Sequence, residues 1–119
     1  MMNKRKLISA LALACLAWGA QAQGTAYPNK PVRLVVGFAP GGAADYVARA
    51  MSDAMGKSLG QTVIVENRAG AGSSIAAENV AKSAADGYSV LLASPSSISV
   101  NPALNPKLNY TPKDLVPVT

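Results

Sequence analysis

Residues 32–59 read VRLVVGFAPGGAADYVARAMSDAMGKSL, and the pattern of this stretch changes once along its length. Its first part, Val32–Phe38, is rich in β-branched and apolar residues, which favours a strand. The turn residues Pro40-Gly41-Gly42 end that strand, because they do not continue a sheet. From Ala43 to Leu59 apolar residues recur at four-residue steps, which predicts a helix. Its buried stripe is expected to consist of Val47, Met51, Met55 and Leu59, with Ala50 and Ala54 on the same face.

The alternation of strand and helix continues toward the C-terminus. Thr62–Glu66 reads as a second strand, Ser73–Lys82 as a second helix and Ser89–Ser94 as a third strand. Short links between such elements predict an α/β fold of right-handed βαβ units. We expect a parallel sheet in the order 2-1-3, covered by helices on both faces. Leu115 to Thr119 looks like the start of a further strand.

The N-terminus has the design of a secretory signal. Three basic residues, Lys4 to Lys6, precede an apolar run from Leu7 to Trp18, and small residues follow up to Ala22. The run is shorter than the ~20 apolar residues that a membrane-spanning helix needs. We therefore expect residues 1–22 to be a cleaved signal peptide and residues 23–119 to be a domain exported to the periplasm.

The composition narrows the chemistry. The sequence has no histidine, and its one cysteine, Cys15, lies within the expected signal. Ser-His-Asp and Cys-His catalysis and the common metal sites are therefore excluded for this chain by itself, and we expect no catalytic residue, metal or cofactor. Outside the signal, eight basic residues stand against six acidic ones and form no stripe, so nucleic acid is not an expected partner.

Two nucleotide-binding motifs are nearly present. Gly37 and Gly42 have the spacing of a P-loop, but Ala43-Ala44 stand where lysine and a hydroxyl residue must hold phosphate and metal. Gly70-x-Gly72 follows a strand, as a dinucleotide fingerprint would, but Ile75 occupies the third small position. A nucleotide-dependent enzyme is the disfavoured hypothesis.

Three loops should meet at the carboxyl edge of a parallel sheet, where ligands of such folds bind. They span residues 39–45, 68–74 and 94–99. The first contains Gly41-Gly42, the second Ser73-Ser74 and the third Ser96-Ser97. Amides, hydroxyls and helix N-termini with few charges suit a carboxylate that is held by neutral donors.

Each of these residues also has a purely structural interpretation. Gly41-Gly42 could serve only a tight strand-to-helix turn, and Ser73-Ser74 could only cap a helix. Ser96-Ser97 could be ordinary loop hydroxyls. Asp45 suits the first turn of a helix because an acid there is favourable to the helix dipole.

Five motifs, in order and spacing, resemble one family. They are Tyr27-Pro28-x-Lys30-Pro31-Val32-Arg33, Phe38-Ala39-Pro40-Gly41-Gly42-x-x-Asp45, Val65-Glu66-Asn67-Arg68-x-Gly70-Ala71-Gly72, Asp86-Gly87-Tyr88 and Asn101-Pro102-Ala103-Leu104. Together they resemble the Bug-type extracytoplasmic receptors of tripartite tricarboxylate transporters. The resemblance covers essentially all of Tyr27 to Thr119.

The resemblance implies a two-lobed fold of the type II periplasmic binding proteins, of which this chain would be the truncated first lobe. It implies a receptor without enzymatic activity that captures a small carboxylate for membrane transporter subunits and is a monomer when full length. The residues that it implies as ligand contacts are Ala39, Gly41, Gly42, Asp45, Ser73, Ser74, Ser96 and Ser97.

Two alternatives stay open at this stage. The same capture chemistry would serve a sensor that reports its ligand to a membrane signalling partner, and a truncated remnant would bind nothing. Ala69 replaces the family's usual proline, and Ser73-Ser74 stand in a loop that is commonly richer in glycine. These departures leave the identity of the carboxylate open.

Overall fold

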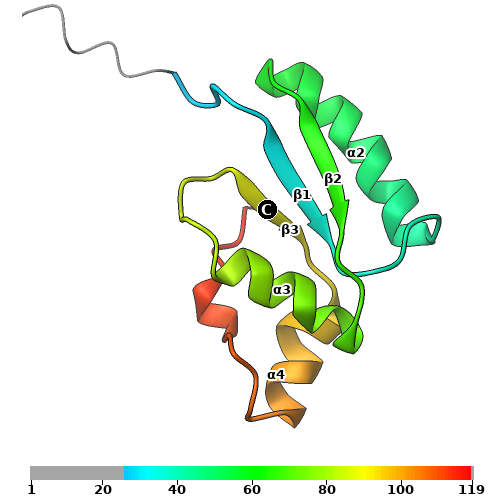
Figure 1. Cartoon of the computed structure of the whole chain (residues 1–119), viewed down its shortest axis with the longest axis vertical. Coiled ribbons are helices and arrows are strands. Elements are labelled where there is room, and N and C mark those ends of the chain that lie inside the picture. Colours follow the sequence, from blue (N-terminus) through cyan, green and yellow to red (C-terminus); the bar gives the residue numbers. More distant parts are fainter. Residues whose placement is uncertain (1–25, 119) are drawn as a thin grey trace, which may run out of the picture.

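The computed structural model describes residues 26–118, so the expected signal peptide lies outside the described residues. Three strands alternate with helices along the chain (Figure 1). The elements are β1 (Val32–Val36), α2 (Ala43–Leu59), β2 (Val63–Asn67), α3 (Ser74–Ala81), β3 (Ser89–Leu92) and α4 (Asn101–Leu104). Single helical turns, Ala71–Ser73 and Ser96–Val100, lead into α3 and α4, and a third, Pro112–Asp114, lies near the C-terminus.

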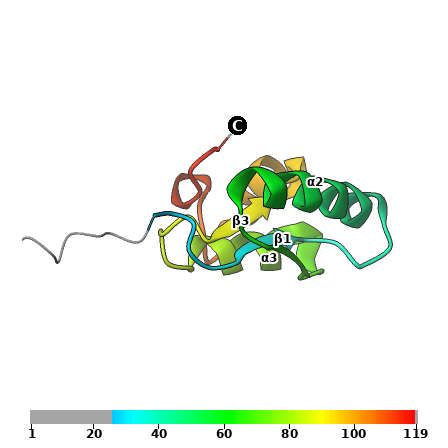
Figure 2. The same ribbon diagram turned by 90° about the horizontal axis from the view of Figure 1, so that it is seen from above.

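The sheet is parallel, with the strand order β2-β1-β3, which confirms the predicted α/β class and topology. In the register, Leu34 of β1 lies between Val65 of β2 and Val90 of β3. Figures 1 and 2 show α2 on one face of the sheet and α3 on the other, as two successive right-handed crossovers in opposite directions require.

Helix α2 spans the predicted residues, but the prediction of its buried stripe is wrong for Val47 and Met51, while Met55 and Leu59 are partly buried. Ala48 and Ser52 face the sheet and are buried, whereas the side chains of Val47 and Met51 are 47% and 40% exposed. A Cβ on Gly56 would lie only 3.2 Å from the carbonyl oxygen of Gln61. Small residues therefore line the contact face because the helix backbone lies close to the chain that enters β2.

The core lies between α2 and the sheet. Leu34, Val36 and Ala48 are buried there, and valines of the flanking strands pack around them. Side chains alternate along a strand, so Val35 faces the opposite side, where Ala76 and Ala77 of α3 are also buried. Both faces of β1 are thus apolar, as in a sheet covered on both sides.

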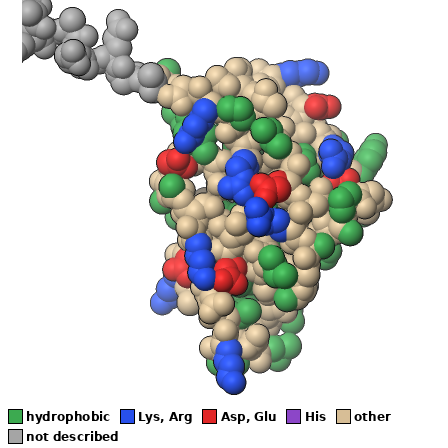
Figure 3. Space-filling model, in the orientation of Figure 1, with side chains coloured by type: hydrophobic (Ala, Val, Ile, Leu, Met, Phe, Trp, Pro, Cys, Tyr) green, Lys and Arg blue, Asp and Glu red, His purple; other side chains and the backbone are tan. Residues whose placement is uncertain are grey.

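The end of the described chain differs from expectation. Residues 115–118 form no strand, and Val116 and Val118 are 86% and 83% exposed. Within residues 26–118 we find no helix with the length and apolar character of a membrane span. On the face shown in Figure 3, acidic and basic side chains are interspersed and do not gather by sign.

Candidate functional site

The loops that follow the three strands leave the sheet at one edge, because the strands are parallel. In Figure 1 the N-terminal ends of α2, α3 and the turn before α4 gather at this edge. Each helix N-terminus has N–H groups without intrahelical partners and a positive dipole end. The geometry therefore offers a set of donors for a negatively charged group.

The first loop turns sharply into α2. Gly41 has a φ of 83°, which only glycine adopts easily, and Gly42 is the N-cap of α2 in an extended conformation. Ala39, Gly41 and Gly42 are all exposed, and a Cβ on Gly41 would meet no atom within 4 Å. The backbone of this loop is therefore open to approach from solvent.

Asp45 is buried in the first turn of α2, and its carboxylate fixes the first loop through hydrogen bonds. Its Oδ2 accepts hydrogen bonds from the Gly41 amide at 2.9 Å and from Arg49 Nε at 3.0 Å. Its Oδ1 accepts one from Asn67 Nδ2 at 3.0 Å. Both carboxylate oxygens are thus occupied by donors of the protein itself.

These contacts keep Asp45 ionised. The hydrogen bonds from Arg49, from the Gly41 amide and from Asn67 lower the pKa of Asp45 to about 2, against an ordinary value of 3.8. The Arg49 guanidinium, one helical turn away, offsets the negative charge. An acid beside an anion-binding loop would repel the anion, and this neutralisation removes the conflict.

The second loop carries backbone strain. Ala71 and Ser73 have positive φ values of 47° and 71°, although neither is glycine. Ser73 is 1% exposed, and its Oγ has no hydrogen-bond partner among the described residues. Ser73 lies against Gly37, the residue after β1. A Cβ on Gly37 would come within 1.7 Å of Ser73 Oγ. Strained residues of this kind are frequent at binding sites.

Ser74 connects the second loop with the third. Its Oγ accepts a hydrogen bond from Asn101 Nδ2 at 2.7 Å and lies 3.4 Å from the phenol oxygen of Tyr110. Tyr110 in turn donates to the carbonyl oxygen of Ser97 at 2.6 Å. Ser74 therefore takes part in a buried network. It is not the N-cap of α3, because Ser73 occupies that position, without a side-chain hydrogen bond to the helix.

The third loop closes on itself. Ser97 is fully buried, its Oγ donates to the carbonyl of Ser94 at 3.0 Å, and the Ser94 amide donates to Ser97 Oγ at 3.1 Å. Ser96 is half-buried at the start of the turn that leads into α4. Of the two serines selected from the sequence here, Ser96 is the more accessible.

The structure thus divides the expected site residues into two groups. Ala39, Gly41, Gly42 and Ser96 are accessible from solvent, whereas Asp45, Ser73, Ser74 and Ser97 lie beneath them as buried supports. Sequence reasoning gave no role to Asn67, Asn101 and Tyr110, which join the loops. Asn67 and Asn101 stand within two of the motifs that carry the family resemblance, Glu-Asn-Arg and Asn-Pro-Ala-Leu. Their place in those motifs was the only indication in the sequence that these residues matter.

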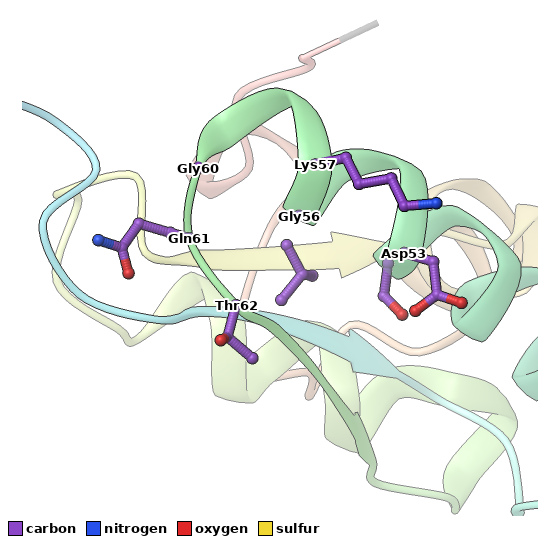
Figure 4. Close-up of a pocket in the computed structure, with 8 residues that line it drawn as sticks. Asp53, Gly56, Lys57, Gly60, Gln61 and Thr62 are labelled. Carbon is purple, nitrogen blue, oxygen red and sulfur yellow. The ribbon is translucent and has the colours of Figure 1, made fainter.

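A hollow at the opposite end of the sheet does not coincide with these loops. It has a volume of about 460 Å³ and lies between the end of α2 and the start of β2. Figure 4 shows Asp53 and Lys57 on the helix side and Gln61 and Thr62 on the strand side. It is an open depression at the amino edge, where none of the described helices α2, α3 and α4 begins, so we place the candidate site at the carboxyl edge.

Comparison with known proteins identifies the family to which the chain is similar. The family described as "Tripartite tricarboxylate transporter family receptor" matches residues 47–119. BugT of Bordetella pertussis is 42% identical over 122 residues, which cover 99% of this chain and 37% of BugT. The chain therefore spans about a third of the length of its curated relatives.

Solved structures give the same result. MatC of Rhodopseudomonas palustris, solved with bound malate, superposes with a TM-score of 0.72 at 42% identity, over 77% of this chain and 32% of MatC. A second R. palustris protein, solved with adipate, gives a TM-score of 0.57 at 38% identity, over 59% of this chain and 23% of that protein.

Proposed function

The chain belongs to the tripartite tricarboxylate transporter receptor family, and we propose that the protein captures a small carboxylate in the periplasm for a membrane transporter of that type. The family is one of solute-binding receptors and not of enzymes. Capture without chemical conversion needs donors, shape and burial, and it needs no nucleophile or general base.

The observation that carries the proposal is the open N-terminus of α2. Gly42 is the N-cap of α2, and Ala43 and Ala44 are its first residues, whose N–H groups have no intrahelical acceptor. The neighbouring Gly41 amide is already bound by Asp45, so that loop is fixed while the amides that follow it stay available. Fixed amides at the positive end of a helix favour an anionic group and cost little ordering when it binds.

The bound acids of similar proteins indicate the class of ligand. MatC was solved with malate and the second R. palustris protein with adipate, and both are dicarboxylates. We propose a dicarboxylate of this size, with one carboxylate near Gly42 and Ser96. The three loops would form one wall of the binding cleft. A second wall would face them, because binding clefts typically bury roughly 70–90% of the surface of their ligands.

Calorimetry with malate, adipate and a panel of related acids tests the proposal on the protein as its host produces it. Gly42→Val puts a branched side chain in front of the amides without backbone strain, because the φ of Gly42 is −86°. We expect at least about a tenfold loss of affinity, which corresponds to ~1.4 kcal/mol. Ala50→Val, on an exposed turn of the same helix, is the matched control. Unchanged affinity in Gly42→Val would remove the site from this edge.

Two further measurements address export and partner. Mass spectrometry of the periplasmic protein should give Gln23 as the first residue, and an uncleaved Met1 in the membrane fraction would contradict export through a signal peptide. Ligand-dependent co-purification with transporter membrane subunits would support the transport role. Co-purification with a membrane kinase in their place would establish the sensor alternative.

A further inference from the structure

Two asparagine side chains join the three loops of the candidate site. Asn67, the last residue of β2, donates through Nδ2 to the carbonyl of Phe38 at 3.1 Å and to Asp45 Oδ1 at 3.0 Å. Phe38 directly precedes the first loop, and Asp45 lies in the helix that this loop enters. Asn67 therefore fixes the first loop to the start of the second.

Asn101, the first residue of α4, makes the equivalent connection on the other side. Its Nδ2 lies 3.1 Å from the carbonyl of Ala71, 2.9 Å from that of Gly72 and 2.7 Å from Ser74 Oγ. These three acceptors belong to the strained second loop and the start of α3. Asn101 therefore fixes the third loop region to the second.

From these contacts we propose that Asn67 and Asn101 are positioning residues, which hold the three loops in the ligand-binding arrangement before the ligand arrives. The inference rests on the proposed function, because it concerns the same site. Neither side chain contacts the ligand; each acts through the loop backbone. Loops that are already ordered in the free protein lose little conformational entropy on binding. If that order is lost, binding must restore it, and the affinity falls.

The chemistry of the asparagine amide explains why this residue type serves here. All five acceptors are oxygens, and each amide nitrogen offers two N–H donors without a charge, which Asn101 shares among three oxygens. An aspartate at position 67 would place a second carboxylate about 3 Å from Asp45 and offer no donor. A lysine or arginine would supply donors but would add a charge beside Arg49.

The test measures malate and adipate affinity and thermal unfolding for Asn67→Ala and Asn101→Ala in the protein as its host produces it. Asn79→Ala is the matched control: Asn79 is half-buried and hydrogen-bonded to Arg33 at 3.1 Å, but it lies on α3 away from the loops. We expect roughly a tenfold or larger loss of affinity in the first two variants, equivalent to ~1.4 kcal/mol. The control should lose thermal stability and keep its affinity.

Asn67→Asp is a second variant that retains the shape of the side chain. At neutral pH the new carboxylate faces Asp45, whose charge partner is Arg49 on α2. The charged neighbours of Asn67 in sequence, Glu66 of β2 and Arg68 directly after the strand, pair with each other. Affinity should be low at pH 8 and should recover toward pH 5, relative to the wild type at each pH, because a protonated acid can again donate to Asp45. A purely structural role would not produce this recovery.

Hydrogen exchange separates failure of this inference from failure of the proposed function. In Asn67→Ala the Gly41 amide should lose protection, whether or not a ligand binds. If the wild type binds neither acid, the proposed function fails for these probes, and the exchange rate of Gly41 still decides the positioning role. Wild-type protection of Gly41 in Asn67→Ala, or affinity losses no larger than that of Asn79→Ala, would overturn the inference.

Discussion

Replacing Ser73 by glycine should stabilise the protein, although it removes a polar side chain from the candidate site. Two features of Ser73 are unfavourable in the described structure. Its φ of 71° places an L-residue in the left-handed region, which costs about 1–2 kcal/mol. Its hydroxyl is buried without a partner among the described residues, which costs about 1–3 kcal/mol. Glycine removes both costs, while its greater freedom in the unfolded chain takes back about 0.5–1 kcal/mol.

The net gain for Ser73→Gly is therefore about 1–4 kcal/mol. In a domain of this size, 1 kcal/mol raises the Tm by roughly 4–8 °C, so differential scanning calorimetry will resolve it. Two matched variants separate the contributions. Ser73→Ala removes only the hydroxyl and keeps the backbone strain, whereas Ala71→Gly relieves the strain at an exposed neighbour whose φ is 47°.

We expect the Tm to rise in all three variants, and most in Ser73→Gly. The reasoning is refuted if Ser73→Gly and Ser73→Ala lower the Tm while Ala71→Gly raises it. That pattern would mean that the Ser73 hydroxyl is satisfied in solution and contributes to stability. A higher Tm combined with weaker carboxylate binding would have another meaning: the strained hydroxyl is kept for the ligand at the expense of stability.

Three further predictions concern Asp45, the contact between Gly37 and Ser73, and the core face of α2. Asp45→Asn should destabilise the protein at pH 7. The difference in stability from the wild type should shrink as the pH falls from about 4 to about 2, because the ionised Asp45 stabilises the fold only above its folded pKa. Urea unfolding at each pH measures this difference. Gly37→Ala should destabilise by about 1–3 kcal/mol or more, because its Cβ would lie 1.7 Å from Ser73 Oγ, and Ser73→Gly should rescue it only in part, since a 2.8 Å contact to the Cα remains. Ala48→Leu should cost about 1–3 kcal/mol by overpacking the core, whereas Val47→Ser should change stability by less than ~0.5 kcal/mol; the reverse order would restore the stripe first expected from the sequence.

The sequence was sufficient for the elements and their order, because local pattern determines both. The switch from a β-branched run to a four-residue period located α2 to the residue, and the strand order β2-β1-β3 follows from two right-handed crossovers once they run in opposite directions. The buried face of α2 could not be predicted from apolar periodicity. It depends on how closely the helix approaches the sheet, and the close approach at Gly56 favours small residues over large ones.

The supports of the site were also beyond the sequence pattern. Asn67 reaches Phe38, and Tyr110 reaches Ser97, only because the fold brings distant segments together. Asparagine and tyrosine in loops have many ordinary roles, so residue type alone gave no reason to select them. The first and third strands were each expected to be two residues longer, and the second was expected one residue earlier. Gly37, the residue after β1, lies against Ser73 of the second loop, a contact that no local pattern shows.

The central place of β1 has a consequence for when the molecule can fold. This strand is the first to leave the ribosome, but Val32 pairs with Val63, and Arg33 must wait for Ser89. Parallel pairing over such separations requires large loops to close first, which slows folding. The three described strands therefore cannot all pair until the third is made, and a chain that folds slowly has more time to be exported before it folds. The strand order is therefore compatible with the export that the proposed function requires.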